Sequence, residues 1–475
     1  MMKPGLPKTD AIVVGSGPNG LAAAIRLAQA GWSVVVVEAA QTPGGGVRSA
    51  EITLPGFVHD ICSSVYPMVV CSPFLSKLPL SQHGLEWVFP AAAVAHPFDD
   101  GTAALLYKSM ADTAAGLGRD GRGYEDLIGD LVDHWEELFA AALAPITAIR
   151  KPFLMARFGL RAMRSVRMIA RAYFRTERAR GLFAGMGGHS MVPLETLTSA
   201  ASALMLMTAA HAAGWPFVRG GSQQLTNALI SYLKSLGGQV VTDWRVDSLD
   251  ELPKVRAVLL DVTPRQLLNI AGSRLPERYR RKLQKFRYGM GSFKIDWALS
   301  EPVPWTASEC SLAGTVHIGG TLDEISDSER RSWRGEVPER PYVLFAQPSL
   351  FDQARAPAGQ HTAWAYCHVP NGFRGNLVDT IEKQVSRFAP GFRDCILERS
   401  VMGPGELERH NPNLVGGDIG GGAFTPGQLF IRPTVSLYRT PLEGIYLCSS
   451  STPPAPGVHG MCGYFAAQAA LARNR

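Results

Sequence analysis

The sequence is poor in the patterns that would indicate a metal site, a disulfide framework or a redox-active thiol pair. Its seven cysteines are an odd number scattered over 475 residues, and no two of them stand in a C-x-x-C arrangement. The spacings typical of zinc ligands are also missing, so we predict no metal site. Scattered cysteines of this kind fit a reducing compartment, and we therefore expect a cytoplasmic protein.

Long apolar runs are equally scarce. The first ten residues hold two prolines and two lysines and lack the apolar region of a secretory signal. One uncharged stretch, residues 196–218, is long enough to be considered as a membrane span. It contains Thr208, His211, Gly214 and Pro216 and is otherwise rich in Ala and Met. We expect a buried helix that runs into a loop.

Charged residues make up only 19% of the chain, against 46% hydrophobic residues, which excludes disorder as the dominant state. The length suggests two or three domains. The sequence lacks a second G-x-G-x-x-G placed in a strand–turn–helix unit, a G-x-S-x-G elbow and an H-E-x-x-H pair. A separate NAD domain, a serine hydrolase and a zinc protease are therefore disfavoured.

The positive charge is concentrated in residues 150–180, which carry ten basic side chains and one acid, while the whole chain has a net charge of +6. At 100° per residue, six arginines share one side of a predicted helix, opposite a row of apolar residues. The arginines are Arg161, Arg164, Arg167, Arg171, Arg175 and Arg178. Two interpretations stay open, a solvent-facing side of an ordinary helix and a peripheral contact with an anionic membrane surface. No nucleic-acid-binding motif accompanies the patch, so we expect no nucleic-acid partner.

The N-terminus contains a dinucleotide-binding pattern. A short β-branched strand, residues 11–14, leads into Gly15-Ser-Gly17-Pro18-Asn19-Gly20, and residues 21–30 then have the composition of a helix. In this pattern Gly15 permits a tight turn, Gly17 lets a pyrophosphate approach the backbone, and Gly20 lets helix and strand pack closely. The N-terminus of the helix offers free N–H groups and a positive dipole end to the phosphates.

The residues that follow narrow the choice of cofactor. Glu38 ends a second buried strand, residues 33–37, where it can accept hydrogen bonds from a ribose hydroxyl. A carboxylate there repels a 2′-phosphate, which disfavours NADP and leaves FAD and NAD. The loop Gly44-Gly45-Gly46-Val-Arg48 then offers bare backbone and a fixed positive charge near the phosphates. An ordinary turn with a surface arginine is the alternative.

This arrangement resembles the flavoprotein superfamily of phytoene desaturases and amine oxidases, and most closely its phytoene-desaturase-like and retinol-saturase-like oxidoreductases. The resemblance covers residues 10–65, 215–265 and 425–475. It implies FAD as the cofactor. The FAD contacts that it implies are Gly15, Gly17, Pro18, Asn19, Gly20, Glu38, Ala39, Gly45, Gly46, Arg48, Val246, Ser450, Ser451, Gly457, Val458 and Met461.

The two later blocks carry less specific motifs. In the middle block, Arg219-Gly220-Gly221-Ser222 precedes a predicted helix, and a strand over residues 239–249 would lie over the adenine. In the C-terminal block, residues 444–447 are predicted to form a strand, residues 448–460 a turn and residues 461–472 a helix facing the flavin. The chain has serine at two turn positions where the family usually has glycine.

The resemblance places His59 and His459 nearest the flavin. A histidine with an ordinary pKa near 6.5 donates or accepts a proton near neutral pH, so both are candidates for catalysis. A structural histidine bonded to the backbone is the alternative for each. The glycine-rich residues 411–422 around Asp418 would form either a loop over the substrate end of the flavin or a plain flexible loop.

We predict an α/β fold in which a Rossmann-type FAD-binding domain is built from three chain segments, residues 1–95, 215–292 and 400–475. A mixed α+β substrate domain, residues 96–214 and 293–399, is inserted between them. Strand-like runs at residues 291–297, 341–346 and 362–368 suit a mixed sheet that lines a cavity.

The leading functional hypothesis is an FAD-dependent oxidoreductase. It would move a hydride between flavin N5 and a C–C bond of a small apolar substrate that is isoprenoid, polyene or lipid-like. Three alternatives stay open: an amine oxidase, for which Tyr66 and Tyr464 are candidates for an aromatic cage, a redox-neutral isomerase, and a non-catalytic lipid-binding protein. The sequence leaves the oligomeric state undetermined.

Overall fold

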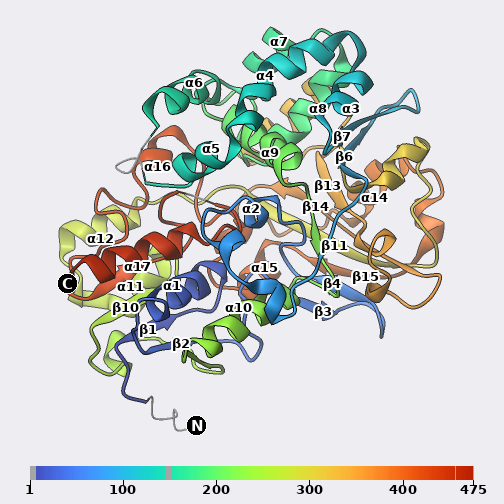
Figure 1. Cartoon of the computed structure of the whole chain (residues 1–475). Coiled ribbons are helices and arrows are strands. Elements are labelled where there is room, and N and C mark those ends of the chain that lie inside the picture. Colours follow the sequence, from blue (N-terminus) through green and yellow to red (C-terminus); the bar gives the residue numbers. More distant parts are fainter. Residues whose placement is uncertain (1–6, 146–150, 455, 474–475) are drawn as a thin grey trace.

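The dinucleotide-binding pattern forms the centre of a five-stranded parallel sheet (Figure 1). The computed structural model describes residues 7–145, 151–454 and 456–473. The strands are β16 (Ile445–Leu447), β10 (Ala257–Leu260), β1 (Ala11–Val14), β2 (Val34–Val37) and β9 (Gln239–Val241), in that spatial order, and every neighbouring pair is parallel. The sheet therefore joins the N-terminal, middle and C-terminal parts of the chain.

Helices cover this sheet on both faces, as its β-branched and almost wholly buried strands require. On one face Val13 and Val36 pack with apolar residues of α1, α10 and α17. On the other face Ile12 and Val35 pack with α11 and α12. The helix bounds are α1 Pro18–Ala28, α10 Gln223–Ser235, α11 Pro264–Ala271, α12 Glu277–Gln284 and α17 Met461–Arg473. The predicted α/β class is confirmed.

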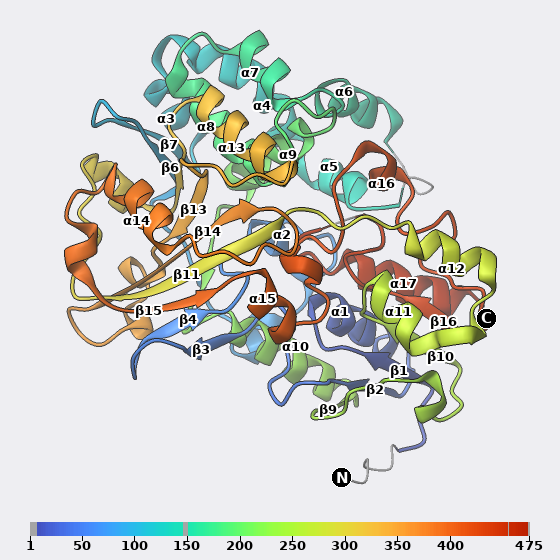
Figure 2. The same cartoon turned by 180° about the vertical axis from the view of Figure 1, so that it is seen from behind.

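A second sheet of seven strands is mixed, because β12 and β6 pair in parallel while its other neighbours are antiparallel. Its order is β15 (Ile396–Met402), β11 (Gly291–Leu299), β14 (His361–Val369), β13 (Val343–Ala346), β12 (Ala313–Ile318), β6 (Ala92–Pro97) and β7 (Ala103–Tyr107). Figure 2 shows β15, β11, β14 and β13 from behind. The three strand-like runs predicted for a mixed sheet form β11, β13 and β14.

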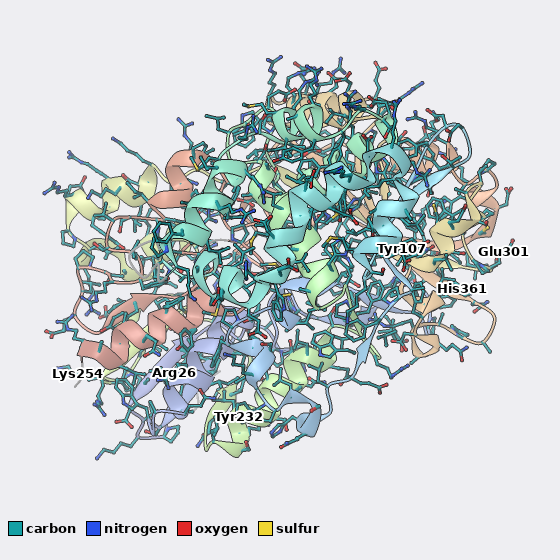
Figure 3. All side chains as sticks on the ribbon, turned by 45° about the horizontal axis from the view of Figure 1, so that its top comes forward. Arg26, Tyr107, Tyr232, Lys254, Glu301 and His361 are labelled. Atoms are coloured by element: carbon teal, nitrogen blue, oxygen red, sulfur yellow. The ribbon has the colours of Figure 1, made fainter. Side chains whose placement is uncertain are left out.

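Two short antiparallel strand pairs and a group of helices complete the fold, and side chains fill the space between the ribbons (Figure 3). The pairs are β3 (Ser49–Glu51) with β4 (Val58–Asp60), and β5 (Trp87–Val88) with β8 (Phe217–Val218). The other helices are α2 Pro67–Val70, α3 Met110–Gly116, α4 Gly121–Asp133, α5 Trp135–Ala142, α6 Pro152–Ala162, α7 Val166–Tyr173, α8 Glu177–Gly188, α9 Ala200–Ala212, α13 Leu322–Trp333, α14 Val378–Ser386, α15 Pro404–His410 and α16 Pro426–Phe430. The predicted domain boundaries stay a prediction.

The single basic helix predicted for residues 150–180 is wrong. The described part of this segment forms α6, α7 and the start of α8, because Ser165 and Thr176 each accept a backbone N–H and begin a new helix. The arginines therefore do not form one row. Arg161 pairs with Asp130 at 2.5 Å, and Arg178 donates to the backbone oxygen of Gly116.

Two further stretches can be compared with the sequence-based expectation. The uncharged residues 196–218 contain the mostly buried helix α9 followed by a loop and β8, as predicted. Across the described residues, no helix is both long enough and apolar enough to cross a membrane. The strand predicted over residues 239–249 is wrong beyond Val241, since the chain turns at Asp243, whose φ of 56° is left-handed.

Candidate functional site

A large cavity begins at the carboxyl ends of β1 and β2 and extends to the helices around α9. Its volume is about 1030 Å³. One part of its wall comes from the β1–α1 turn, the end of β2 and the loop before β3, and the other part from α5, α6, α9 and the strands β12, β13 and β14. Ligands of open α/β sheets bind in such a crevice beyond the carboxyl ends of the strands.

Most of the predicted cofactor contacts share the wall of this cavity. They come from the N-terminal, middle and C-terminal segments that the fold brings together. The wall contains Gly15, Gly17, Pro18, Asn19, Glu38, Ala39, Gly45, Gly46, Arg48, Val246, Ser450, Gly457 and Val458.

The β1–α1 turn is shaped for a ligand that touches the backbone. A Cβ atom at Gly20 would lie 2.1 Å from the backbone oxygen of Gly15, so only glycine allows the turn to close. The side-chain oxygen of Asn19 is buried and, among the described residues, has no hydrogen-bond partner. The turn therefore offers α1 N–H groups and a spare acceptor, which fits a bound dinucleotide.

Glu38 holds this turn against the end of β2. Its Oε2 accepts hydrogen bonds from the backbone N–H of Ser16 at 2.8 Å and from the Ser16 hydroxyl at 2.6 Å. Its Oε1 accepts from the backbone N–H of Ala40 at 2.9 Å. The carboxylate thus orders the phosphate loop, and its contact with a ribose stays a prediction.

Arg48 is buried in the wall with its guanidinium held from two sides. Its Nε donates to the Gly45 oxygen at 2.9 Å and its Nη2 to the His410 oxygen at 3.1 Å. Burial lowers the pKa of Arg48, whereas the negative charge of Glu38 raises it. The guanidinium is a fixed positive charge within the cofactor side of the cavity.

Three predicted contacts lie beside the cavity rather than in its wall. The Gly20 N–H donates to Asp261, the Ser451 hydroxyl donates to the Gly421 oxygen at 2.7 Å, and the Met461 N–H donates to His459 at 3.0 Å. Each supports a neighbouring residue of the wall. Direct contact of these three with FAD stays a prediction.

The structure separates the two candidate histidines. His459 lies in the cavity wall, where its Nδ1 accepts the Met461 N–H. His59 is not part of the wall: its Nε2 lies 2.8 Å from the Thr53 hydroxyl, and its Nδ1 is 3.6 Å from Asp296. Burial, helped by the charge of Lys294, lowers the pKa of His59 to about 3, so the ring is neutral.

The two tyrosines expected to form an aromatic cage are not brought together. Tyr66 lines the cavity, but Tyr464 lies outside it and packs against Phe74, with ring centroids 4.9 Å apart. The wall instead contains Trp364 and Tyr366 of β14, whose rings stack with each other at 5.9 Å and an interplanar angle of 15°.

Asp261 is a site residue that the sequence analysis missed. It follows β10, lines the cavity, and its Oδ2 accepts the Gly20 N–H at 2.9 Å. Burial raises its pKa to about 7, and the charge of Glu38 contributes to the increase. Its position directly after a buried apolar strand was a signal for a residue at the carboxyl edge of the sheet.

Lys294 on β11 was missed as well. It is buried, forms an ion pair with Asp296, and its ammonium lies 5.4 Å from the ring centroid of Trp364 in the cavity wall. Burial raises the pKa of Asp296 to about 6, although Lys294 opposes the increase. Opposite charges two residues apart in an apolar strand share one face of the sheet, and that pattern was visible in the sequence.

Asp418 is structural rather than a free acid above the substrate. Its carboxylate accepts backbone N–H groups of Gly289, Gly420 and Gly422, each at 2.7 Å. These bonds order the glycine-rich loop, which lines the cavity. Among the residues that the structure describes, no group of three or more His, Cys, Asp or Glu side chains is placed to hold a metal ion.

Known proteins are similar to this chain in sequence. Residues 13–73 match the family model of the NAD(P)-binding Rossmann-like domain. Pyridine nucleotide-disulfide oxidoreductase domain-containing protein 2 of Rattus norvegicus is 25% identical over 97% of this chain and 93% of its own length. The lycopene-forming phytoene desaturase of Pantoea ananas is 25% identical, with 97% and 98% covered. These similarities place the chain in the FAD-dependent oxidoreductase superfamily.

Solved structures of other proteins have a similar fold. An oxidoreductase from Methanosarcina mazei superimposes with a TM-score of 0.65 at 15% identity, covering 97% of this chain and 99% of the other. Cyclohexylamine oxidase from Brevibacterium oxydans superimposes with a TM-score of 0.62 at 16% identity, covering 99% and 100%. FAD is the cofactor of this flavoprotein. The β1–α1 turn, Glu38 and Arg48 are the described groups suited to hold its dinucleotide part.

Proposed function

We propose that this flavoprotein acts on a C–C bond of an apolar, uncharged substrate of isoprenoid, polyene or lipid type. The observation that carries the proposal is the distribution of charge along the cavity. Charged side chains in the wall come from the cofactor side, for example Glu38, Arg48 and Asp261. The described part of the wall built by α5, α6, α9 and β12 to β14 contains no Asp, Glu, Lys or Arg.

An uncharged wall selects the substrate and excludes water. A carboxylate or an ammonium group would lose its hydration there without gaining an ionic partner, which is costly. Apolar groups gain about 25 cal/mol per Å² when they leave water. Bound FAD supplies the hydride chemistry, and the chain holds the substrate beside it in a dry, shaped space.

Amine oxidation is the second candidate. The stacked Trp364 and Tyr366 favour it, since aromatic side chains accommodate amine substrates in an uncharged site. The described substrate side has no acid to pair with an ammonium, so attraction to the ring faces would have to hold the cation. Turnover of simple amines with peroxide release would support this candidate over the leading one.

The test of the proposed function begins with the purified protein from its native host. We expect a yellow protein that releases FAD on heating and an apolar small molecule that co-purifies and is found by mass spectrometry. Anaerobic incubation with that molecule is expected to change the flavin absorbance and to give a product that differs by two hydrogens. A product of unchanged mass would indicate a redox-neutral isomerase. A colourless preparation that cannot be reconstituted with FAD would leave only the lipid-binding alternative.

Contact with a membrane surface would give such a substrate a route to the cavity, and we propose that α6 makes it. One side of α6 lines the cavity through Phe158 and Ala162. The same helix exposes Phe153 by 91% and Leu160 by 77%, with Arg157 nearby on the surface. The helix thus lies between the cavity and solvent with an apolar outer side and a basic neighbour, which suits the surface of an anionic bilayer.

Liposome co-sedimentation tests the contribution of α6. The Phe153→Glu/Leu160→Glu variant is expected to bind phosphatidylglycerol vesicles at least about 10-fold more weakly than the wild type. Each of the two apolar side chains gains about 2 kcal/mol of free energy when it leaves water for the bilayer, and the variant loses this gain. Leu397→Glu on β15 is the matched control, since Leu397 is 45% exposed. Equal recovery of the double variant and the wild type would contradict the proposed contact.

A further inference from the structure

The substrate side of the cavity is mostly apolar, and the segment between α8 and α9 adds a group of polar side chains to its wall. This segment, residues 189–199, contributes His189, Ser190, Met191 and Thr198. In Figure 1, α8 and α9 lie above the middle of the molecule, whereas β1 and β2 lie at its base. The segment therefore belongs to the end of the cavity away from the dinucleotide motif.

Two hydroxyl groups in this segment are buried without a partner. Ser190 is 3% exposed and Thr198 is 0% exposed. Neither the Ser190 Oγ nor the Thr198 Oγ1 has a hydrogen-bond partner within the described residues. Buried hydroxyls are nearly always hydrogen-bonded, to protein, to ordered water or to a ligand, so this wall has unused hydrogen-bonding capacity.

His189 adds a third polar group to the same wall. Its Nε2 lies 3.0 Å from the Nε2 of His317, and its ring packs edge-on against Trp215, with centroids 6.2 Å apart. The indole N–H of Trp215 in turn donates to the Thr315 hydroxyl at 3.2 Å. The ring of His189 is thus held in place, and its Nδ1 has no partner in the described part of the chain.

The polar side chains that this segment contributes to the cavity wall carry no charge at neutral pH. Burial, together with repulsion from His368, lowers the pKa of His189 to about 3, and burial also lowers the pKa of His317 well below its ordinary value. A neutral imidazole and two hydroxyls can donate and accept hydrogen bonds. They cannot neutralise a carboxylate or an ammonium group.

The backbone of the segment is held in an unfavourable conformation. Met191 has φ 52° and Thr198 has φ 77°, and both residues lie in the cavity wall. Left-handed backbone is rare for residues with a side chain, and rarest for a β-branched residue such as threonine. Such conformations gather at ligand sites, where the surrounding structure maintains them.

From these observations we propose that His189, Ser190 and Thr198 form a neutral hydrogen-bonding subsite for one hydroxyl or carbonyl group of an otherwise apolar substrate. The inference rests on the proposed function and refines it: the preferred substrate is an oxygenated lipid or isoprenoid rather than a pure hydrocarbon. The subsite would also fix which bond of a long chain lies beside the cofactor, because the oxygen is bound at one end.

Equilibrium binding of C15 isoprenoids to the FAD-loaded protein tests the subsite. The probes are farnesol, farnesene, farnesoic acid and farnesylamine, and the readout is the change in the flavin absorbance spectrum together with titration calorimetry. We expect farnesol to bind at least about 10-fold more tightly than each of the other three, since a site built to bond an oxygen rejects the analogue that lacks it.

Variants test whether the preference for farnesol depends on the proposed subsite residues. In Ser190→Ala/Thr198→Val the ratio of farnesol to farnesene affinity is expected to fall below about 3-fold, because hydrogen bonds to the ligand are lost while volume is kept. His189→Phe is a separate second variant, and thermal unfolding confirms that each protein is folded. Ser202→Ala, which removes another hydroxyl of the cavity wall, is the control and should keep the wild-type ratio.

Each outcome has a defined meaning. Equal binding of farnesol and farnesene to the wild type would overturn the subsite and leave the proposed function standing. A ratio that persists in both His189→Phe and the double variant, or that falls equally in Ser202→Ala, would also overturn it. Absence of binding by all four probes would count against the proposed function itself and, with it, against the subsite.

Discussion

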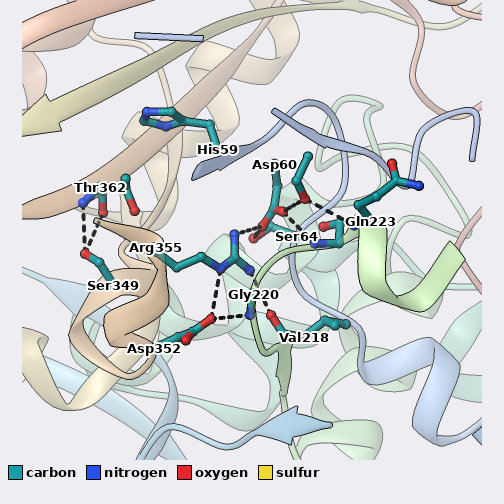
Figure 4. A network of polar contacts seen from close by, with 12 residues as sticks. His59, Asp60, Ser64, Val218, Gly220, Gln223, Ser349, Asp352, Arg355 and Thr362 are labelled. Carbon is teal, nitrogen blue, oxygen red and sulfur yellow. Dashed lines mark hydrogen bonds and ion pairs between the residues drawn. The ribbon is translucent and has the colours of Figure 1, made fainter. Parts of the chain in front are cut away.

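Arg355→Met is expected to lower the free energy of unfolding by about 3–5 kcal/mol near neutral pH, the scale for removing one partner of a buried ion pair. Arg355 pairs with Asp60 at 3.0 Å and with Asp352 at 3.0 Å, and all three side chains are 0% exposed (Figure 4). Its Nη2 also donates to the Val218 oxygen at 2.9 Å. The substitution would leave two carboxylates buried without their cation.

The loss is large because Arg355 connects segments that are distant in the sequence. Asp60 ends β4, and its carboxylate also accepts the Ser64 hydroxyl and the backbone N–H of Ser222. Asp352 accepts the backbone N–H of Gly220 at 2.7 Å. The guanidinium thus ties together the chain after the arginine loop, the entry to α10 and the turn before β14.

The pH dependence of the stability loss shows whether the unpaired carboxylates cause it. Burial alone raises the pKa of Asp60, but Arg355 and hydrogen bonds from serines more than offset this effect and hold it below its ordinary value. In the wild type this contribution to stability is present above about pH 4 and is lost as the pH falls. In the variant the unpaired carboxylates become neutral in acid, so the difference between the two proteins should shrink as the pH falls below about 5.

Chemical denaturation at pH 7 and pH 4.5 measures both effects. Arg281→Met is the control, because Arg281 is 72% exposed at the side chain and pairs with Glu277 on its own helix. Its expected effect is below about 0.5 kcal/mol. A similar loss in both variants, or a loss for Arg355→Met that does not depend on pH, would contradict the buried-pair explanation.

Gly20→Ala is expected to weaken FAD binding by at least about 100-fold, because misplacement of a binding loop by about 1 Å has effects of this size. The added Cβ would lie 2.1 Å from the Gly15 oxygen and 3.1 Å from the Asp261 carboxylate. The β1–α1 turn would have to open, which moves the N-terminus of α1 away from the phosphates.

The measurement is the flavin content of the purified variant and its affinity for added FAD by absorbance titration. Gly116→Ala makes the same chemical change in α3, where a Cβ meets nothing within 4 Å, and should retain wild-type flavin. Wild-type affinity in Gly20→Ala would show that FAD does not use this turn. Thermal unfolding of both variants separates loss of cofactor from loss of fold.

The cofactor side of the site was predictable because its signals are local. The strand, glycine turn, helix and second strand follow one another in residues 11–38, and each step is dictated by backbone sterics and by the burial of β-branched side chains. The class of the fold follows from this unit. Residues 291–297, 341–346 and 362–368 were recognisable as strands for the same reason, although their pairing was not.

The substrate side was decided by the tertiary structure. Ser165 and Thr176 break the predicted basic helix. His59 is not part of the cavity wall, and Lys294 lies behind that wall, beside the ring of Trp364. One cavity wall combines side chains from separate elements, for example His189, Thr198 and Trp364. Their proximity depends on packing between residues up to hundreds of positions apart, and short-range periodicity contains no information about such contacts.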